Sequence, residues 1–167
     1  MAGETAPSLP LGVNLPNSDW IRSVHGSKSV NLENVASSRS AYEVPLRHAL
    51  YLPAYHDVLA RYGSMTNSLH TDLHEIAGHG SGKLLDGVQT DVLGVYYSTI
   101  EEARADLVAL YFIGDEQLLR IGVYDSDVVV HDAALAQYVS YLTNGAMGQL
   151  RRVALGSDLT QAHFRNR

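Results

Sequence analysis

The chain has 167 residues and a formal net charge of −6, and 46% of its residues are hydrophobic while 18% are charged. These values fit one globular domain with a proper core and exclude a disordered chain. The absence of cysteine excludes disulfides, thiolate metal sites and thiol catalysis, so a metal site would need His, Asp or Glu ligands. With no basic cluster beyond Arg151-Arg152, we expect neither nucleic acid nor an anionic membrane as a partner.

The N-terminal third is expected to be rich in loops. Residues 1–11 predict an irregular lead-in and residues 12–167 a single domain, in which residues 12–34 form an ordered loop with short extended pieces. Residues 1–10 carry no signal-like apolar run, and no stretch approaches the roughly 20 apolar residues of a membrane helix. A cytoplasmic protein is the default expectation, although the lack of cysteine also suits a periplasmic one.

Two helices are predicted in the middle of the chain, followed by a connection. The first covers 55–62 and ends at Gly63. The second covers 66–79, because apolar residues recur there at helical spacing, and its N-cap oxygens are offered by Ser64, Thr66 and Asn67. Residues 83–98 then form a connection that holds a possible short strand at 92–97.

From Ser98 onward the chain is predicted to consist mainly of helices, which makes the fold class mainly α. A helix opens at Ser98 and runs to 113, with a capping box from either Thr99–Glu102 or Ser98–Glu101. A third helix covers about 126–154, and a last one is still running at Arg167. The buried face of the 98–113 helix is expected to consist of Ala103, Leu107, Leu110 and Tyr111.

The segment His74–His79 combines two imidazoles with a carboxylate, Glu75. Zinc favours such ligands, and the familiar helical motif places its two histidines four residues apart. Here they are five apart, which would turn the second ring roughly 140° from the first on a regular helix. The spacing therefore predicts a bulge at Ala77-Gly78 if both imidazoles bind one metal ion. Glu75 would act as the general base toward a metal-bound water.

A catalytic zinc site needs a third protein ligand, and Glu101-Glu102 at the start of the next helix is the expected source. Glu102 is the predicted ligand, while Asp106 and Glu101 would accept the second N–H of the two imidazoles. Two alternatives stay open on the residues alone. In the first, the histidines and acids are ordinary polar residues of helices and bind no metal. In the second, the ligands are His70 and His74, which are four residues apart.

Further polar residues allow two interpretations each. Asn14 and Asn17 either line a substrate cleft or make turns, and turns are favoured. His163 and Arg167, four apart on the last predicted helix, either stabilise an oxyanion or lie on a solvated surface, and the surface is favoured. Tyrosines 96, 97, 138 and 141 are expected in the core or at interfaces with satisfied hydroxyls.

The motifs resemble those of one known family. The segment 74–82, HEIAGHGSG, is similar to the HExxGH zinc motif of the dipeptidyl peptidase III family, the M49 metallopeptidases. EEARAD at 101–106 resembles the family's EExRxD/E motif. Residues 12–30 resemble its substrate-cleft segment, and 161–167 resemble the segment that carries its catalytic histidine and a following arginine. The resemblance therefore covers nearly the whole chain.

The resemblance implies a role for each matching residue. His74, His79 and Glu102 would bind one Zn²⁺ per chain, and Glu75 would activate water. Glu101 and Asp106 would orient the imidazoles. The remaining implied roles are peptide main-chain binding by Asn14 and Asn17, transition-state stabilisation by His163, and assistance or substrate binding by Arg167.

The family also implies a function and a partner. Its members release N-terminal dipeptides from short peptides in a cleft between two lobes, and these motifs belong to the mainly helical zinc lobe. Family enzymes are several times longer, so the resemblance leads us to expect that the given chain does not include the other lobe or an upstream catalytic tyrosine. The expected function is a zinc-dependent dipeptidyl peptidase. The alternative is a non-catalytic zinc-binding or interaction module that has lost its partner lobe.

Overall fold

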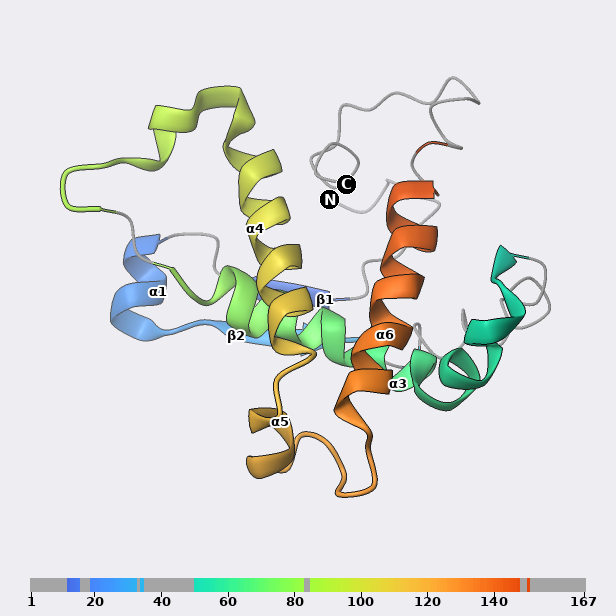
Figure 1. The fold of residues 1–167 in the computed structure, drawn as a ribbon. Helices are drawn as coiled ribbons and strands as arrows, with labels where there is room; N and C mark the ends of the chain where they lie inside the picture. The colour runs from blue at the N-terminus through green and yellow to red at the C-terminus, as the bar shows by residue number, and fades with distance from the viewer. Residues whose placement is uncertain are drawn as a thin grey trace.

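The computed structural model describes residues 12–15, 19–32, 34, 50–82, 85–147 and 150. This part of the chain is mainly helical, as predicted (Figure 1). Among these residues no helix has the length and apolar content needed to cross a membrane. The predicted lead-in at 1–11, the last helix up to Arg167 and the end of the third helix lie outside the described residues.

The longest element is α3 (His56–Leu73), which continues without a break into the π-helix η2 (His74–His79). The prediction of two helices separated at Gly63 is wrong, because Gly63 is buried inside α3. Packing of the amphipathic helix outweighs the roughly 1 kcal/mol cost of an interior glycine. Thr66, expected as an N-cap, instead donates its hydroxyl to the carbonyl of Tyr62 at 3.0 Å, one turn earlier.

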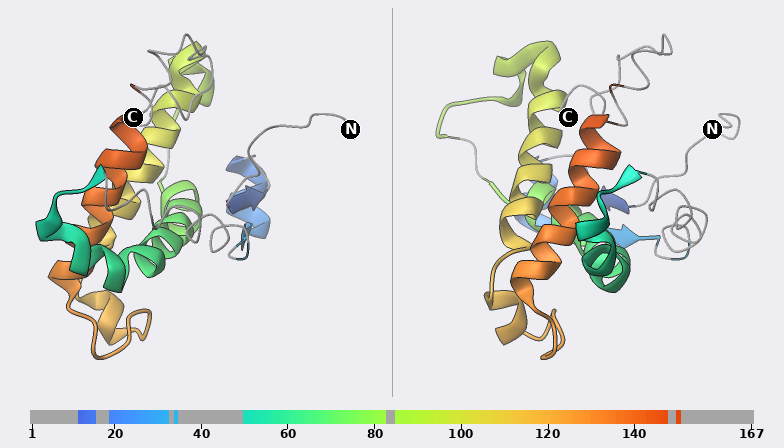
Figure 2. Two further views of the ribbon diagram at one scale, coloured as in Figure 1. Left: turned by 90° about the vertical axis from the view of Figure 1, so that its right-hand side faces the viewer. Right: turned by 45° about the vertical axis from the view of Figure 1, so that its right-hand side comes forward.

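A small N-terminal unit lies beside the C-terminal end of α3 and η2 (Figure 2). Strands β1 (Gly12–Leu15) and β2 (Lys28–Asn31) pair antiparallel, with Val13 opposite Val30. Between them lies α1 (Asp19–His25), which the sequence patterns did not predict. Asn31 fixes the unit to α3, since its Nδ2 donates to Asp72 Oδ1 at 2.9 Å.

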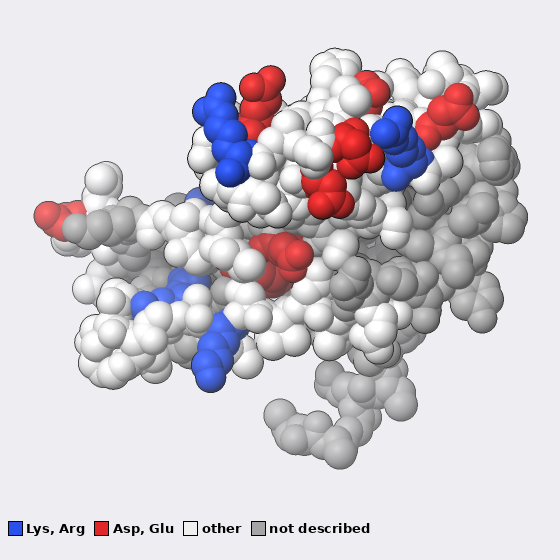
Figure 3. Space-filling view, turned by 90° about the horizontal axis from the view of Figure 1, so that it is seen from below, with Lys and Arg blue, Asp and Glu red and all other residues white. Residues whose placement is uncertain are grey.

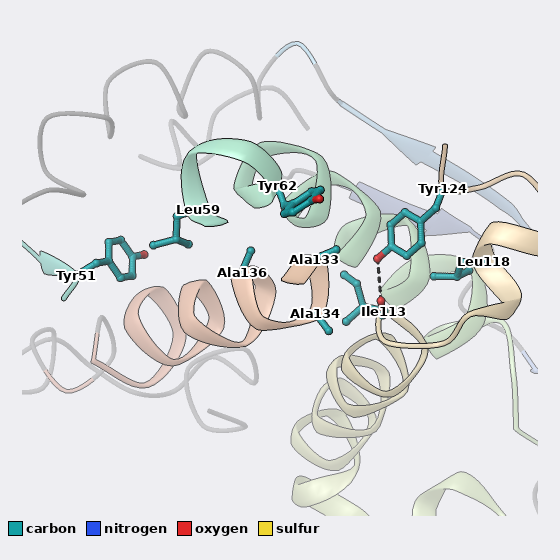
Figure 4. Packing of buried hydrophobic residues seen from close by; sticks show 9 residues of the cluster. All are labelled: Tyr51, Leu59, Tyr62, Ile113, Leu118, Tyr124, Ala133, Ala134 and Ala136. Atoms are coloured by element: carbon teal, nitrogen blue, oxygen red, sulfur yellow. Dashed lines mark hydrogen bonds between the residues drawn. The ribbon is translucent and has the colours of Figure 1, made fainter. Parts of the chain in front are cut away.

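The hydrophobic core lies between α3 and α6 (Val130–Tyr141), at the end nearest α5 (Gln117–Arg120) (Figure 4). Ala133 and Ala136 of α6 point toward α3, and their small side chains allow the two helices to approach closely (Figure 4). The Tyr124 hydroxyl is buried and donates to the Ile113 carbonyl at 2.8 Å, which joins the α5 region to the end of the preceding helix. The buried cluster comprises Tyr51, Leu59, Tyr62, Ile113, Leu118, Tyr124, Ala133, Ala134 and Ala136.

Helix α4 (Tyr97–Phe112) stands against η2 on one side and against α6 further along. Its buried residues are Ala105, Asp106 and Ala109. The predicted burial of Leu107 and Tyr111 is wrong, since they are 65% and 74% exposed. The close contact with η2 selects the face of α4 that carries small side chains. The predicted capping boxes are also wrong, because Tyr96 is the N-cap and makes no side-chain cap bond.

The part of the connection directly before α4 is helical, not extended. The possible strand at 92–97 is replaced by the 3-10 helix η3 (Thr90–Tyr96), whose path bends at Gly94 with φ of 50°. The described chain also contains the 3-10 helix η1 (Pro53–Tyr55) and the π-helix η4 (Leu142–Met147), which continues α6. On the face shown in Figure 3, charged side chains are few, and acidic and basic ones lie next to each other in places among uncharged residues.

Candidate metal centre

The bulge predicted from the five-residue histidine spacing is confirmed, because η2 is a π-helix from His74 to His79. A π-turn takes one residue more than an α-turn, so residues five apart regain a common face. The two imidazole rings are accordingly close, with centroids 4.7 Å apart and planes at 87°. The extra residue in the motif therefore brings the histidines together instead of separating them.

Helix α4 brings Glu102 to both imidazoles. His74 Nε2 lies 3.3 Å from one carboxylate oxygen and His79 Nε2 lies 3.6 Å from the other. The three residues each offer a ligand atom within 4.8 Å of the other two. Ligands arranged tetrahedrally at about 2.0–2.1 Å from zinc lie roughly 3.3 Å from one another. Two imidazole nitrogens and a carboxylate at this spacing fit the donor set and size of a catalytic zinc site.

The second nitrogen of each imidazole faces its own carboxylate. His74 Nδ1 lies 3.0 Å from Asp106 Oδ1, and His79 Nδ1 lies 3.2 Å from Glu101 Oε1. A carboxylate at Nδ1 holds the proton on that nitrogen and leaves Nε2 as the electron-pair donor. The sequence predicted both acids for this purpose, and the structure now pairs each with one histidine. Asp106 also accepts the Tyr141 hydroxyl at 2.8 Å from α6.

The charges of the cluster change two pKa values. Burial disfavours the protonated form of His74, but hydrogen bonds and charges from Asp106 and Glu102 outweigh it and raise the pKa to about 9. Burial also disfavours the Glu101 carboxylate, but Arg104 and His79 outweigh it and lower the pKa to about 2. Without a metal, the site therefore holds a proton that a divalent cation would have to displace.

Two arginines lie at the C-terminal end of η2. Arg104 donates to both oxygens of Glu101, at 2.6 and 2.9 Å, and to the Gly78 carbonyl at 2.8 Å. Arg22, from α1, donates to the His79 carbonyl at 2.7 Å. Both guanidinium groups line a cavity of about 640 Å³ that is bounded by α1, the segment after η2 and the start of α4. Glu101 and His79 also line this cavity, whereas Glu102 does not.

The structure describes only some of the other residues that were predicted to belong to the site. Glu75 follows His74 in the first turn of η2 and is half-buried. Asn14 pairs with Ser29 in the β1–β2 hairpin, which contacts η2. Asn17, His163 and Arg167 lie outside the described residues. His70, the rival ligand, is buried with Nε2 at 3.9 Å from Asp106 Oδ1 and falls outside the set of converging ligand atoms.

Three residues of this cluster had no predicted role in it: Arg22, Arg104 and Tyr141. Arg104 carries a local signal, since it follows Glu101 by three residues on a helix and such pairs face each other. Tyr141 was expected only as a packing residue with a satisfied hydroxyl. Arg22 is 57 residues from the carbonyl it binds, and nothing in the sequence pattern indicates that contact.

Comparison with known proteins identifies relatives of this chain. A family model described as Peptidase family M49 matches residues 4–96 and 89–167. Dipeptidyl peptidase 3 of Dictyostelium discoideum is 34% identical over 173 residues, which cover 84% of this chain and 24% of that protein. The enzyme of the same name from Nematostella vectensis is 26% identical over 195 residues, covering 99% of this chain and 26% of that protein.

A solved structure agrees with this assignment. The structure of DPP III from Caldithrix abyssi superposes with a TM-score of 0.63 at 26% identity, over 93% of this chain and 28% of that one. The chain therefore spans about a quarter of the length of the relatives it matches. The match to the family model over nearly the whole chain identifies it as a member of peptidase family M49.

Proposed function

We propose that this chain is the zinc-binding part of a dipeptidyl peptidase that releases N-terminal dipeptides from short peptides. The observation that carries the proposal is the convergence of three ligand groups: His74 and His79 come together on the π-helix that their spacing requires, and α4 brings Glu102 to them. Relatives named dipeptidyl peptidase 3 support the reaction class. Residues 12–167 would form one lobe, and a second lobe of the parent enzyme would complete the cleft.

The residues of the site divide the chemical work. When bound to the two imidazoles and Glu102, Zn²⁺ would lower the pKa of a water ligand to about 7 and polarise a peptide carbonyl. Glu75 would act as the general base, which accepts a proton from the attacking water and returns it to the leaving amine. Asp106 and Glu101 keep the imidazole protons on Nδ1 so that both Nε2 atoms face Glu102.

Substrate binding would come from segments on either side of this centre. Asn14 and Asn17 would bind the peptide main chain, since the hairpin that carries Asn14 lies against η2. His163 would stabilise the transition state, and Arg167 would assist it or bind substrate. These roles follow from the family resemblance of their segments, and each is separable by substitution in a full-length M49 enzyme.

A second candidate function is a non-catalytic zinc-binding or interaction module. The observation that favours it is the ligand cluster itself, because the convergence of His74, His79 and Glu102 fits metal binding with or without catalysis. A third is a helical scaffold without metal, in which the histidines and acids form an ion-paired cluster. The distances from Nε2 to Glu102, 3.3 and 3.6 Å, suit a protonated His74 in such a cluster as well.

Two measurements separate the three functions. Elemental analysis of the purified chain should find one zinc per chain, and a chain without zinc that binds none on titration would leave only the scaffold. A dipeptidyl-naphthylamide assay then tests activity in a full-length M49 enzyme that contains this segment, with and without a chelator. Chelator-sensitive release of naphthylamine supports the peptidase, whereas a zinc-loaded full-length enzyme that releases none supports the binding module.

A further inference from the structure

The carbonyl groups that end η2 are bound by arginine side chains from two other elements. The last carbonyls of a helix have no partner within the helix, and a cation beside them is favoured by the helix dipole. Arg104 of α4 donates to the Gly78 carbonyl at 2.8 Å, and Arg22 of α1 donates to the His79 carbonyl at 2.7 Å. The π-turn is thus fixed at its C-terminal end, directly at one candidate zinc ligand.

Arg104 reaches the same histidine by a second path. Its Nε and Nη2 atoms bind the two oxygens of Glu101, which in turn faces His79 Nδ1 at 3.2 Å. A bidentate guanidinium–carboxylate pair fixes the plane of the carboxylate as well as its position. Arg104 therefore constrains both the backbone of His79, through Gly78, and the orientation of its imidazole ring, through Glu101.

We propose that Arg22 and Arg104 are positioning residues of the metal centre, which hold His79 in the geometry needed to bind zinc. A π-turn is strained relative to an α-helix, and it persists only where its surroundings fix it. Here the two arginines supply that constraint at the C-terminal end of η2. This inference rests on the proposed function, because it takes His79 to be a zinc ligand.

Arg22 also joins two parts of the candidate site. It belongs to α1, which lies between β1, the strand of Asn14, and its partner β2. The bond to the His79 carbonyl therefore ties the segment assigned to peptide binding to the segment assigned to zinc. A displacement of α1 would therefore move the His79 carbonyl, and a change in the backbone of η2 would move the hairpin.

The geometry predicts different tolerance for lysine at the two positions. The bond from Arg22 to η2 runs from Nη1 to the His79 carbonyl, and a lysine ammonium can replace it. Arg104 divides its donors between Glu101 and Gly78, and a single ammonium cannot reproduce the paired bonds to the carboxylate. Arg22→Lys should thus retain zinc binding far better than Arg22→Ala, whereas Arg104→Lys should behave like Arg104→Ala.

The test is zinc affinity, measured by competition with a chromophoric chelator in the full 167-residue chain. Loss of a group that orients a ligand typically weakens metal binding about 10- to 100-fold, which is the change expected for Arg104→Lys, Arg104→Ala and Arg22→Ala. The d–d absorption of the Co²⁺-loaded chain is the second readout. At saturating Co²⁺ these variants should show altered bands, because the coordination geometry changes with the orientation of His79.

Arg61→Ala is the matched control, since Arg61 lies on α3 with a 59% exposed side chain and an ion pair of 3.9 Å to Asp127. It should keep wild-type affinity and spectrum. A purely structural role of Arg22 and Arg104 would lower the unfolding midpoint but leave the Co²⁺ spectrum of the loaded chain unchanged, and that result overturns the inference. Wild-type zinc affinity in the Arg104 variants would also overturn the inference, and it would leave the proposed function unaffected. Failure of the unsubstituted chain to bind zinc would overturn the proposed function, and this inference with it.

Discussion

Gly78 lies so close to Ala105 that no side chain fits between η2 and α4. A Cβ atom built on Gly78 would lie 2.7 Å from the Ala105 Cα and 2.8 Å from its Cβ. Real Cβ atoms essentially never approach this closely, so a larger residue would push the two elements apart. These elements carry all three candidate zinc ligands, His74 and His79 on η2 and Glu102 on α4. The glycine therefore controls the distance between the imidazoles and the carboxylate.

Gly78→Ala should weaken zinc binding and destabilise the fold. Overpacking of a close contact typically costs about 1–3 kcal/mol, and η2 must move away from α4 to relieve it. Denaturant unfolding and chelator competition measure the two effects. Gly114→Ala is the control, because its added Cβ would meet Ala134 and Tyr138 only at 3.5 Å. Equal behaviour of the two variants would show that the approach of η2 to α4 does not control the site.

Glu102→Ala should release zinc, since it removes one of only three protein ligands in the proposed site. Glu101→Ala should have a smaller effect, about 10- to 100-fold in affinity, because Glu101 acts through His79. Zinc content after dialysis and a chelator titration distinguish the two. Glu116→Ala, at an exposed position before α5, is the control. Unchanged zinc stoichiometry in Glu102→Ala would rule out this residue as the third ligand.

Glu75→Gln should separate metal binding from hydrolysis. The amide cannot accept a proton from water, and loss of a general base typically costs about 10²- to 10⁴-fold in rate. The variant should keep one zinc, because Glu75 is not a member of the converging ligand set. Zinc content is measured in this chain, and dipeptidyl-naphthylamide hydrolysis in a full-length M49 enzyme that contains the segment. A loss of zinc equal to that of Glu102→Ala would contradict the assigned role.

The parts of the site that the sequence predicted are those constrained by ligand chemistry. The five-residue spacing of His74 and His79 implies a bulge whatever surrounds it, and the structure confirms η2 as a π-helix. The acids at 101, 102 and 106 come from one short helical segment, so their relative placement follows from helix geometry. The roles of Asn14, Asn17, His163 and Arg167 stay predictions.

The parts that the sequence did not predict depend on contacts between distant segments. Arg22 meets η2 only because the hairpin packs there, and no local pattern encodes a partner 57 residues away. Gly63 and Leu107 were misplaced for a related reason. Local rules made the glycine a helix stop and the leucine a core residue, whereas packing of α3 and the close contact of α4 with η2 overrode both.

The metal-free chain should be most stable between about pH 4.5 and 6.5. The folded-state pKa of His74 is raised from 6.5 to about 9, so its contribution to stability is fully present below pH 6.5 and is lost as the pH rises through 9. The pKa of Glu101 is lowered from 4.5 to about 2, so its contribution is present above pH 4.5 and is lost as the pH falls toward 2.

Zinc affinity should follow the opposite trend on the alkaline side, because the metal needs neutral His74. Between pH 6.5 and 9 the metal-free chain should lose stability while its zinc affinity rises. Denaturant unfolding in chelator and zinc competition at several pH values measure both. His74→Gln should flatten the alkaline loss of stability, whereas His131→Gln, at a side chain that is 86% exposed, should leave it. If the alkaline loss of stability persists in His74→Gln, it arises from the titration of another group.

Tyr141→Phe tests whether the support of the centre extends to α6. The Tyr141 hydroxyl donates to Asp106 Oδ2 at 2.8 Å, and the other oxygen of this carboxylate faces His74. Asp106 is only 1% exposed, so water cannot easily replace the lost donor. A hydrogen bond to a buried charge is worth about 1.5–3 kcal/mol, and the unfolding free energy should fall by that amount.

Tyr138→Phe provides the comparison on the same helix, since its hydroxyl donates to the Leu110 carbonyl at 3.1 Å and its residue is 41% exposed. Loss of this hydrogen bond should lower the unfolding free energy by about 0.5–1 kcal/mol at most, because water can replace the hydroxyl as donor. Zinc affinity should fall in Tyr141→Phe and not in Tyr138→Phe, since only Asp106 orients a candidate ligand. Equal losses of stability with unchanged zinc affinity in both variants would mean that Asp106 holds His74 without help from α6.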